Sequence, residues 1–195
     1  MKFDELNKLF KAYFDVMDIS EKDKKKRLDC AWWFYDAVWY ILSMIRMEND
    51  KGNLNDKEFY RKSLEYRIID SLKDIPYDEE YIEKTTEDII DTTFKYLDDA
   101  EFFLSENRAI LIAQNEANTV MNGADFFYAK KSGKTHKQWI AERDNRTRET
   151  HLLVDGTFIP IDEKFEVGND LMRFPHDYTA SAENVVNCRC SCIYS

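Results

Sequence analysis

The first hundred residues repeat hydrophobic side chains at the spacing of α-helices. One stripe recurs every three or four positions over 3–17, and a wider, aromatic-rich stripe covers 28–45. The window 31–45 holds 13 hydrophobic residues out of 15. It is shorter than the roughly 20 residues that span a bilayer, and Asp36 interrupts it. It therefore predicts a helix buried on nearly all sides and no membrane partner.

Two further helices are predicted after the polar stretch 49–55. Asn55, with Glu58 three residues later, fits a capping box, and the helix that it starts extends to about Lys73. The next helix begins near the acidic run 78–80, because carboxylates in a first turn are stabilised by the helix dipole.

A long helix is predicted from Glu101 to Asn122, with Gly123 positioned as its C-terminal stop. Further along, Asp155-Gly156 stands between two apolar runs, which is typical of a β-hairpin. The pattern therefore changes from helical to partly extended along the chain.

These patterns predict an α+β protein with two regions. Residues 1–100 form a mostly helical body whose role the pattern does not assign. Residues 101–195 form a smaller β-containing unit made of the long helix, a basic segment, the hairpin and a cysteine-rich strand. Only 5 glycines and 3 prolines are present, which disfavours a turn-dense all-β fold.

Charge and composition narrow the classes of partner. The chain carries 28 basic and 38 acidic residues, a net charge of -10, which disfavours sequence-independent binding to duplex DNA. The segment 130–148 is locally basic, with seven basic residues against two acidic ones, so a nucleic acid or an acidic protein surface stays open as its partner. No secretion signal is recognisable at the start, so we expect a soluble intracellular protein with reduced thiols.

Three of the four cysteines, Cys188, Cys190 and Cys192, are spaced at i, i+2 and i+4, which places them on one face of an extended strand. A disulfide between the first two is unfavourable, since Cα atoms two apart on a strand lie roughly 6.5 Å apart. Two thiolates converge more easily on a structural Zn²⁺, with His151 as a third ligand. Reduced thiols in a packed strand and a redox role are the alternatives. The fourth ligand would be another histidine, the third cysteine or a carboxylate: His136, His176, Cys192 or Asp155.

A second group of residues, around His151, is also of a type that takes part in catalysis. His151 follows Arg146 and Arg148, so it is either a general base beside anion-stabilising arginines or a structural residue tied to the cysteine strand. Glu116 is either a partner of these arginines or a carboxylate on the helix surface. The sequence has no nucleophile elbow, no glycine-rich phosphate loop and no H-E-x-x-H motif.

The C-terminal motifs occur in a distinctive order. They are Lys137-x-Trp139, Asp144, Thr147-Arg148, His151, Asp155-Gly156, Pro160, Phe165, Pro175 and Asn187-Cys188-Arg189-Cys190. This order resembles the phage Mu F-like head morphogenesis domain of minor head proteins, over about 105–192. The helix 108–116, R-A-I-L-I-A-Q-N-E, is similar to the family's R-A-x-x-I-A-x-T-E helix, with Asn115 in place of the threonine.

The resemblance implies a non-enzymatic minor head protein of a phage or prophage that acts in procapsid assembly near the portal. It implies partners among the portal, major capsid and scaffold proteins, and a location inside the procapsid or virion after synthesis in the bacterial cytoplasm. The family's signature residues map to a cluster that is expected to hold the fold together with a bound metal: Trp139, Asp144, Arg148, His151, Asp155, Gly156, Cys188 and Cys190.

Two alternatives remain open. The domain also resembles one that is fused to toxin modules, which suggests an effector enzyme, a nuclease or transferase, that uses His151, Arg148 and Glu116. The other alternative is a free-standing zinc-binding interaction module.

Overall fold

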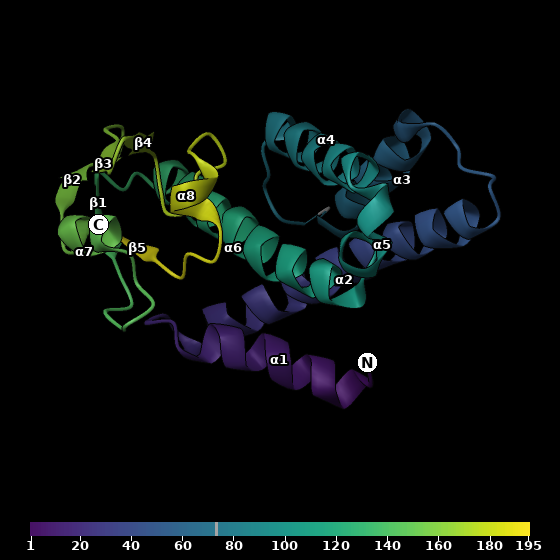
Figure 1. Ribbon diagram of the computed structural model, residues 1–195. Helices are drawn as coiled ribbons and strands as arrows, with labels where there is room; N and C mark the ends of the chain where they lie inside the picture. The colour runs from purple at the N-terminus through teal and green to yellow at the C-terminus, as the bar shows by residue number, and fades with distance from the viewer. Residues whose placement is uncertain (73) are drawn as a thin grey trace. The chain divides into compact units, whose positions relative to one another are not determined.

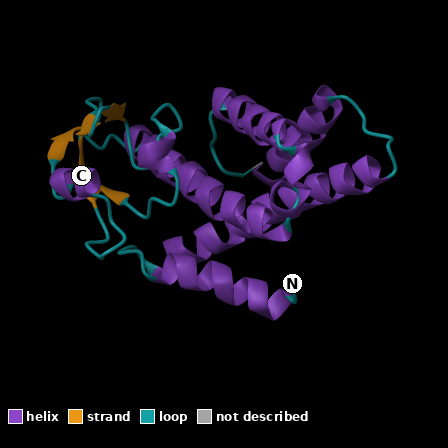
Figure 2. Cartoon of the chain, in the orientation of Figure 1, coloured by secondary structure: helices purple, strands orange, loops and turns teal. Residues whose placement is uncertain are grey.

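The computed structural model describes residues 1–72 and 74–195. Helices dominate, and short strands gather in the C-terminal part (Figure 1, Figure 2), which confirms the predicted α+β class. The helices are α1 (Phe3–Asp15), α2 (Glu21–Asp50), α3 (Lys57–Leu72), α4 (Glu79–Lys95), the 3-10 turn η1 (Leu97–Asp99), α5 (Ala100–Phe103), α6 (Glu106–Lys131), α7 (Glu149–Val154) and α8 (Ala182–Val185). The strands are β1 (His136–Ile140), β2 (Phe158–Pro160), β3 (Phe165–Val167), β4 (Asp170–Met172) and β5 (Ser191–Tyr194).

The residues group into two compact units. The helical unit contains Met1 and Cys30–Ala113, and the motif unit contains Lys2–Asp29 and Gln114–Ser195. Two of the divisions fall within α2 and α6, away from residue 100, where the change in sequence pattern predicted a boundary. The motif unit is therefore built from two segments that are distant in sequence.

In the helical unit, α3 and α4 lie side by side (Figure 1) and bury matching faces. Thr93 of α4 is fully buried and donates its hydroxyl proton to the carbonyl of Ile89 at 2.6 Å. Arg108 of α6 donates to Thr93 Oγ1 at 2.6 Å and to the Ile89 carbonyl at 3.1 Å, so α6 is tied to α4 by satisfied polar groups. The buried residues of the two helices include Tyr60, Leu64, Ile68, Leu72, Ile82, Thr86, Ile89, Ile90 and Thr93.

The start of α3 differs by one residue from the prediction. Asp56 caps the helix, because its Oδ1 accepts the N–H of Phe59 at 2.9 Å. Asn55 instead donates its side-chain N–H to Glu48 at 3.0 Å. The predicted helix end at Lys73 lies outside the described residues.

The predicted single helix from Glu101 to Asn122 was wrong at both ends. The chain forms the short helix α5 and then starts again at Glu106. The Ser105 hydroxyl oxygen accepts the Arg108 N–H at 3.1 Å, so a serine caps the new helix.

Gly123 is not a stop signal, since α6 continues through it to Lys131. A Cβ atom at Gly123 would lie 3.5 Å from the Phe174 ring, so the glycine faces a packed aromatic side chain. The actual stop is Gly133, which has a φ of +76°. Its N–H donates to the Lys130 carbonyl at 3.0 Å, and the next N–H donates to the Ala129 carbonyl at 3.0 Å, which is a Schellman ending.

The motif unit contains two antiparallel sheets. One has the strand order β2-β1-β5, with Gln138 of β1 opposite Phe158 and Ile193. The other is the β3–β4 hairpin, whose turn begins at Gly168 with a φ of +61°. This positive φ at the first turn position is typical of a type II′ turn, where glycine is favoured.

The hairpin predicted around Asp155-Gly156 was wrong, because the residues before the turn form α7 instead of a strand. Asp155 Oδ1 accepts the Ala141 N–H at 2.9 Å, and the Gly156 N–H donates to the Trp139 carbonyl at 2.9 Å. The turn therefore docks against β1, and the strand after it pairs with β1. Gly156 has a φ of +76°, so the turn itself was placed correctly.

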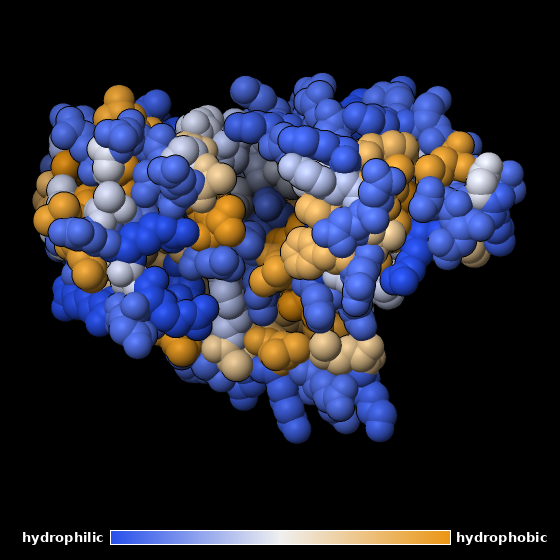
Figure 3. Space-filling model, in the orientation of Figure 1, coloured by the Kyte–Doolittle hydropathy of each residue, from blue (hydrophilic) through white to orange (hydrophobic). Residues whose placement is uncertain are grey.

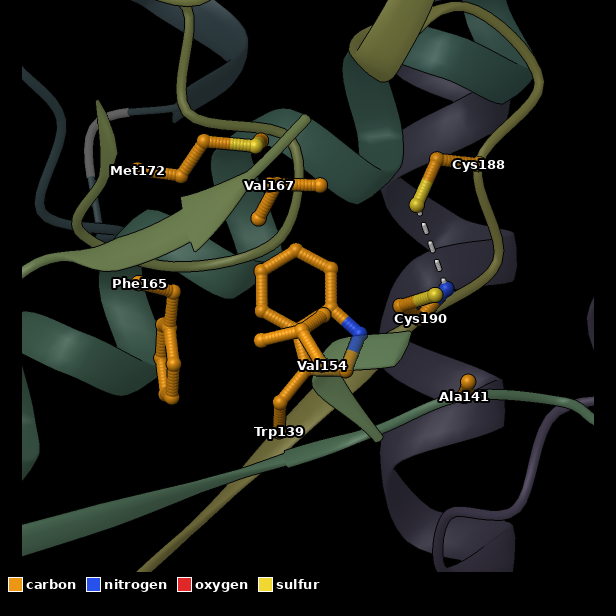
Figure 4. Packing of buried hydrophobic residues seen from close by; sticks show 8 residues of the cluster. All are labelled: Trp139, Ala141, Val154, Phe165, Val167, Met172, Cys188 and Cys190. Carbon is orange, nitrogen blue, oxygen red and sulfur yellow. Dashed lines mark hydrogen bonds between the residues drawn. The ribbon is translucent and has the colours of Figure 1, made fainter. Parts of the chain in front are cut away.

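The core of the motif unit forms around Trp139, which is completely buried (Figure 4). Its ring meets Phe165 edge to face at 5.2 Å between ring centres and His151 in the same way at 5.6 Å. Side chains from α7, β3, β4, the residue after β1 and the segment before β5 complete this core: Ala141, Val154, Phe165, Val167, Met172, Cys188 and Cys190.

The visible surface is mostly hydrophilic. Figure 3 shows hydrophilic residues over most of the visible face, with hydrophobic residues in smaller groups among them. Within residues 1–72 and 74–195, no helix combines the length and the hydropathy needed to cross a bilayer.

Candidate functional site

His151, Cys188 and Cys190 converge in the interior of the motif unit. His151 Nδ1 lies 3.5 Å from Cys188 Sγ and 3.4 Å from Cys190 Sγ. The Cys190 N–H also donates to Cys188 Sγ at 3.4 Å, as the dashed line in Figure 4 shows. All three side chains are buried, so their heteroatoms contact one another instead of solvent.

The pKa values of the two thiols are shifted in opposite directions. Burial acts to raise the pKa of Cys188, but the S–H and N–H of Cys190 and the charges of Arg148 and Arg189 hold it below the ordinary value. The hydrogen bond to Cys188 raises the pKa of Cys190, and burial adds to the effect. One thiol of the pair is therefore favoured as the thiolate and the other as its hydrogen-bond donor.

Three asparagines of α6 hold the segment 187–190 in place. The Asn187 N–H donates to Asn115 Oδ1 at 2.6 Å. Asn118 Nδ2 donates to the Cys188 carbonyl at 3.3 Å, and Asn122 Nδ2 donates to the Cys190 carbonyl at 3.3 Å. Spacings of three and four residues put these amides on one face of the helix. Of the three, only Asn115 belongs to a sequence motif, because an irregular segment gives no local signal for such a partner.

The Cys188 carbonyl accepts further hydrogen bonds from a buried histidine and a half-buried tyrosine. His176 Nε2 donates to it, and the Tyr13 hydroxyl lies within 3.5 Å. Burial lowers the pKa of His176 to about 4, so this histidine is neutral at pH 7. α1 thus contributes to the position of the cysteine segment, although it lies more than 170 residues away in sequence.

Asp144 and Arg189 form a two-pronged ion pair beside the cysteines. Both guanidinium nitrogens of Arg189 donate to the carboxylate at 2.7 Å. These bonds hold the pKa of Asp144 well below its usual range. Arg148 donates to the Val186 carbonyl, which ties the start of α7 to the same segment. The arginines thus fix backbone and carboxylate groups.

The space between these groups is small. A cavity of about 10 Å³ is lined by residues of the 142–148 loop, by His151 and by the segment 187–190. A volume of this size holds about one water molecule, so it has no room for an organic substrate.

The four residues considered as a fourth zinc ligand all lie outside the group of His151, Cys188 and Cys190. The expectation that all three cysteines share a strand face was wrong, because β5 begins at Ser191, after Cys188 and Cys190. Cys192 lies opposite Trp139 and outside the three-residue group. His136 stacks on Phe158, His176 bonds the Cys188 carbonyl, and Asp155 holds the turn after α7.

Several charges of the basic segment 130–148 are already engaged. Lys137 is fully buried and donates to the Arg173 carbonyl at 2.6 Å, and burial lowers its pKa to about 8. Lys130 pairs with Asp162 at 2.6 Å, and Arg143 pairs with Asp155 at 2.5 Å. The segment is therefore less positive toward a partner than its sequence indicates.

Glu116, on α6, is half-buried, and its charge acts to raise the pKa of His176.

A family model supplies the decisive comparison. The model described as Phage Mu protein F like protein matches residues 77–193, which is more than half of the chain. The chain belongs to this family. The match confirms the resemblance read from the motifs, and it begins before the predicted boundary near residue 105, so it also includes α4.

Three curated proteins are similar to parts of this Mu F-like chain. An NAD(+)--arginine ADP-ribosyltransferase EFV of Enterococcus faecalis is 30% identical over 82% of the chain and 36% of its own length. The minor head protein GP7 of Bacillus phage SPP1 is 33% identical over 47% of the chain and 30% of its own length. The uncharacterized protein YqbB of Bacillus subtilis is 34% identical over 32% of the chain and 22% of its own length.

The chain spans about a third or less of the length of these relatives. No solved structure matches it.

Proposed function

We propose that this Mu F-like chain is a non-enzymatic minor head protein that acts in phage or prophage head assembly. Support comes from the family match over 77–193 and from the similarity to the SPP1 minor head protein. Its place of action would be the procapsid near the portal, after synthesis in the bacterial cytoplasm.

The non-enzymatic part of the proposal is supported by one observation: the motif residues have structural roles. Trp139 fills the core, Asp144 and Arg189 bond each other, and Asp155 holds a turn. The space beside His151 holds about one water molecule. An enzyme acting on a nucleotide or a peptide needs a concave site of several hundred Å³. The motif residues therefore fit a role in stabilising the domain that docks in the head.

The partners that we propose are the portal, major capsid or scaffold proteins. The motif unit offers exposed apolar side chains for such contacts, among them Leu153 of α7, which is 79% exposed. Contact with packaged DNA through 130–148 would depend on its exposed basic residues, since Lys137 is buried.

The test is incorporation into heads. The tagged chain is co-expressed with the portal, major capsid and scaffold proteins of the same phage or prophage genome, first singly and then together. We expect co-migration with one of them or with assembled procapsids on size-exclusion chromatography. A matched Leu153→Asp variant should fold normally and co-migrate less if α7 is part of the interface. A chain that enters no assembly and binds none of the three proteins contradicts the proposal.

An activity assay separates the effector alternative. The chain is incubated with NAD⁺ and an arginine-containing acceptor, and nicotinamide release is measured beside a His151→Ala variant. We expect no release above the buffer control. Turnover that disappears in the variant would support the effector alternative and refute the non-enzymatic proposal.

A further inference from the structure

We propose that His151, Cys188 and Cys190 form a binding site for one Zn²⁺ ion. The proposal rests on the arrangement of these side chains and does not depend on the role in head assembly. His151 is contributed by α7 and the two cysteines by the segment before β5, so the ion would join two parts of the motif unit.

The spacing of the ligand atoms fits a tetrahedral ion. With Zn–S bonds of about 2.3 Å and a Zn–N bond of about 2.0–2.1 Å, tetrahedral angles place sulfur and nitrogen roughly 3.6 Å apart. The two distances from His151 Nδ1 to the cysteine sulfurs are 3.5 and 3.4 Å. All three ligand atoms lie within 4.8 Å of one another. The two nitrogen–sulfur spacings therefore need shifts of only a few tenths of an ångström to accept an ion.

The donor set favours zinc over other common ions. Two thiolates and one imidazole are soft to borderline ligands, which suit Zn²⁺ and not Mg²⁺ or Ca²⁺. Two thiolates also neutralise the ion, so the buried site of Cys188, Cys190 and His151 gains no net charge when it is filled. The cavity of about 10 Å³ beside these residues has room for one water molecule as the fourth ligand.

The surroundings fix the ligands before any ion binds. The three asparagines of α6 hold the backbone of 187–190, and the Cys190 N–H already donates to Cys188 Sγ. Coordination through Nδ1 places the remaining imidazole proton on Nε2. Within the described part of the chain, that nitrogen is buried without a hydrogen-bond partner, and the ring is perpendicular to Trp139 at 82°. The packing therefore orients the ring without a polar group behind it.

The competing explanation is a cluster of S–H···N hydrogen bonds, which gives similar distances without an ion. A zinc site and an ion-free cluster differ in the number of metal ions bound per chain and in the absorption spectrum with Co²⁺. The protein is purified in reductant without chelator, and bound zinc is measured by elemental analysis and native mass spectrometry. Co²⁺ is then titrated into the metal-free protein, because thiolate ligands give it an intense charge-transfer absorption.

We expect one Zn²⁺ per chain and a thiolate–cobalt band in the wild type. Cys188→Ser and Cys190→Ser should weaken Zn²⁺ binding by more than the roughly 10–100-fold that loss of an outer-shell partner costs. Cys192→Ser is the matched control, since Cys192 lies two residues beyond Cys190 and outside the ligand group. It should keep the full stoichiometry and the cobalt band.

The proposal can still be tested if the variants fail to fold, because the thermal unfolding of the wild type gives a second measurement. Saturating Zn²⁺ should raise its midpoint of thermal unfolding, since an ion that binds only the folded state stabilises it. A wild type that binds no zinc and shows no cobalt–thiolate band overturns the proposal. Equal Zn²⁺ affinity in Cys188→Ser and in the wild type overturns it as well.

Discussion

Replacing the glycine within α6 and the glycine that terminates it, each with alanine, gives opposite predicted effects on stability. Gly123 lies within the helix and has no positive φ, whereas Gly133 ends the helix with a φ of +76°. The substitution therefore tests directly where α6 stops.

The magnitudes follow from local geometry. At Gly123 a Cβ would lie 3.5 and 3.8 Å from atoms of the Phe174 ring, which is ordinary van der Waals contact. Gly123→Ala should therefore gain the helix-propensity difference and raise the free energy of unfolding by about 1 kcal/mol. At Gly133 no atom lies within 4 Å of a Cβ, but the left-handed backbone costs a non-glycine residue roughly 1–2 kcal/mol. Gly133→Ala should therefore lower the free energy of unfolding by about that amount.

The assay is urea unfolding followed by far-UV circular dichroism, with thermal melts in parallel. For a chain of this size, 1 kcal/mol corresponds to roughly 2–4 °C in the melting midpoint. A destabilised Gly123→Ala variant would show that α6 ends at Gly123, as the sequence alone suggested. A neutral Gly133→Ala variant would show that the Schellman ending does not need glycine.

Three further predictions concern the site and its supports. Asp144→Asn should lower the free energy of unfolding by about 1–2 kcal/mol, because the charge-assisted bonds to Arg189 are lost from a partly exposed pair. In the wild type this contribution is present above the unfolded carboxyl pKa of about 3.9 and is lost as pH falls toward the depressed folded pKa, which acid titration of stability measures in wild type and variant. Asn118→Ala should cost about 1 kcal/mol and speed hydrogen exchange in the segment 187–190, since the Cys188 carbonyl loses a donor; unchanged exchange would contradict the role of α6 in holding it. Lys137→Met should be more stable than the wild type at pH 7, and the difference should shrink between about pH 8 and about pH 10.4, because the folded state releases the Lys137 proton first; a difference independent of pH would refute this.

The sequence predicted the parts of the fold that local periodicity determines. Helical stripes located α1 to α4, and the α+β class followed from the change in pattern after the long helix. The Asp155-Gly156 turn was also located, since a glycine with positive φ serves a helix-to-strand turn as well as a hairpin. What precedes such a turn depends on tertiary packing, so α7 was missed.

The candidate site, too, could be predicted only where local sequence patterns determine it. The approach of His151 to Cys188 and Cys190 could be predicted from the residue types that bind zinc. The separation of Cys192 could not, because alternation on a strand says nothing about residues before the strand begins. Asn187 has a φ of +58°, and this backbone turn precedes the two clustered thiols. The hydrogen bonds from Asn118 and Asn122 connect residues about 70 positions apart and leave no local pattern.

The two-segment composition of the motif unit bears on how the chain folds during translation. Residues 2–29 leave the ribosome before residues 114–195, with which they form one compact unit, and residues 30–113 of the helical unit are made in between. At about 5–20 residues per second, α1 would wait several seconds for its partners. The Cys188 carbonyl, which the Tyr13 hydroxyl of α1 contacts in the folded chain, is made only at the end of that interval. Release of nascent chains stalled before and after residue 190 should therefore yield species that differ in protease resistance at α1.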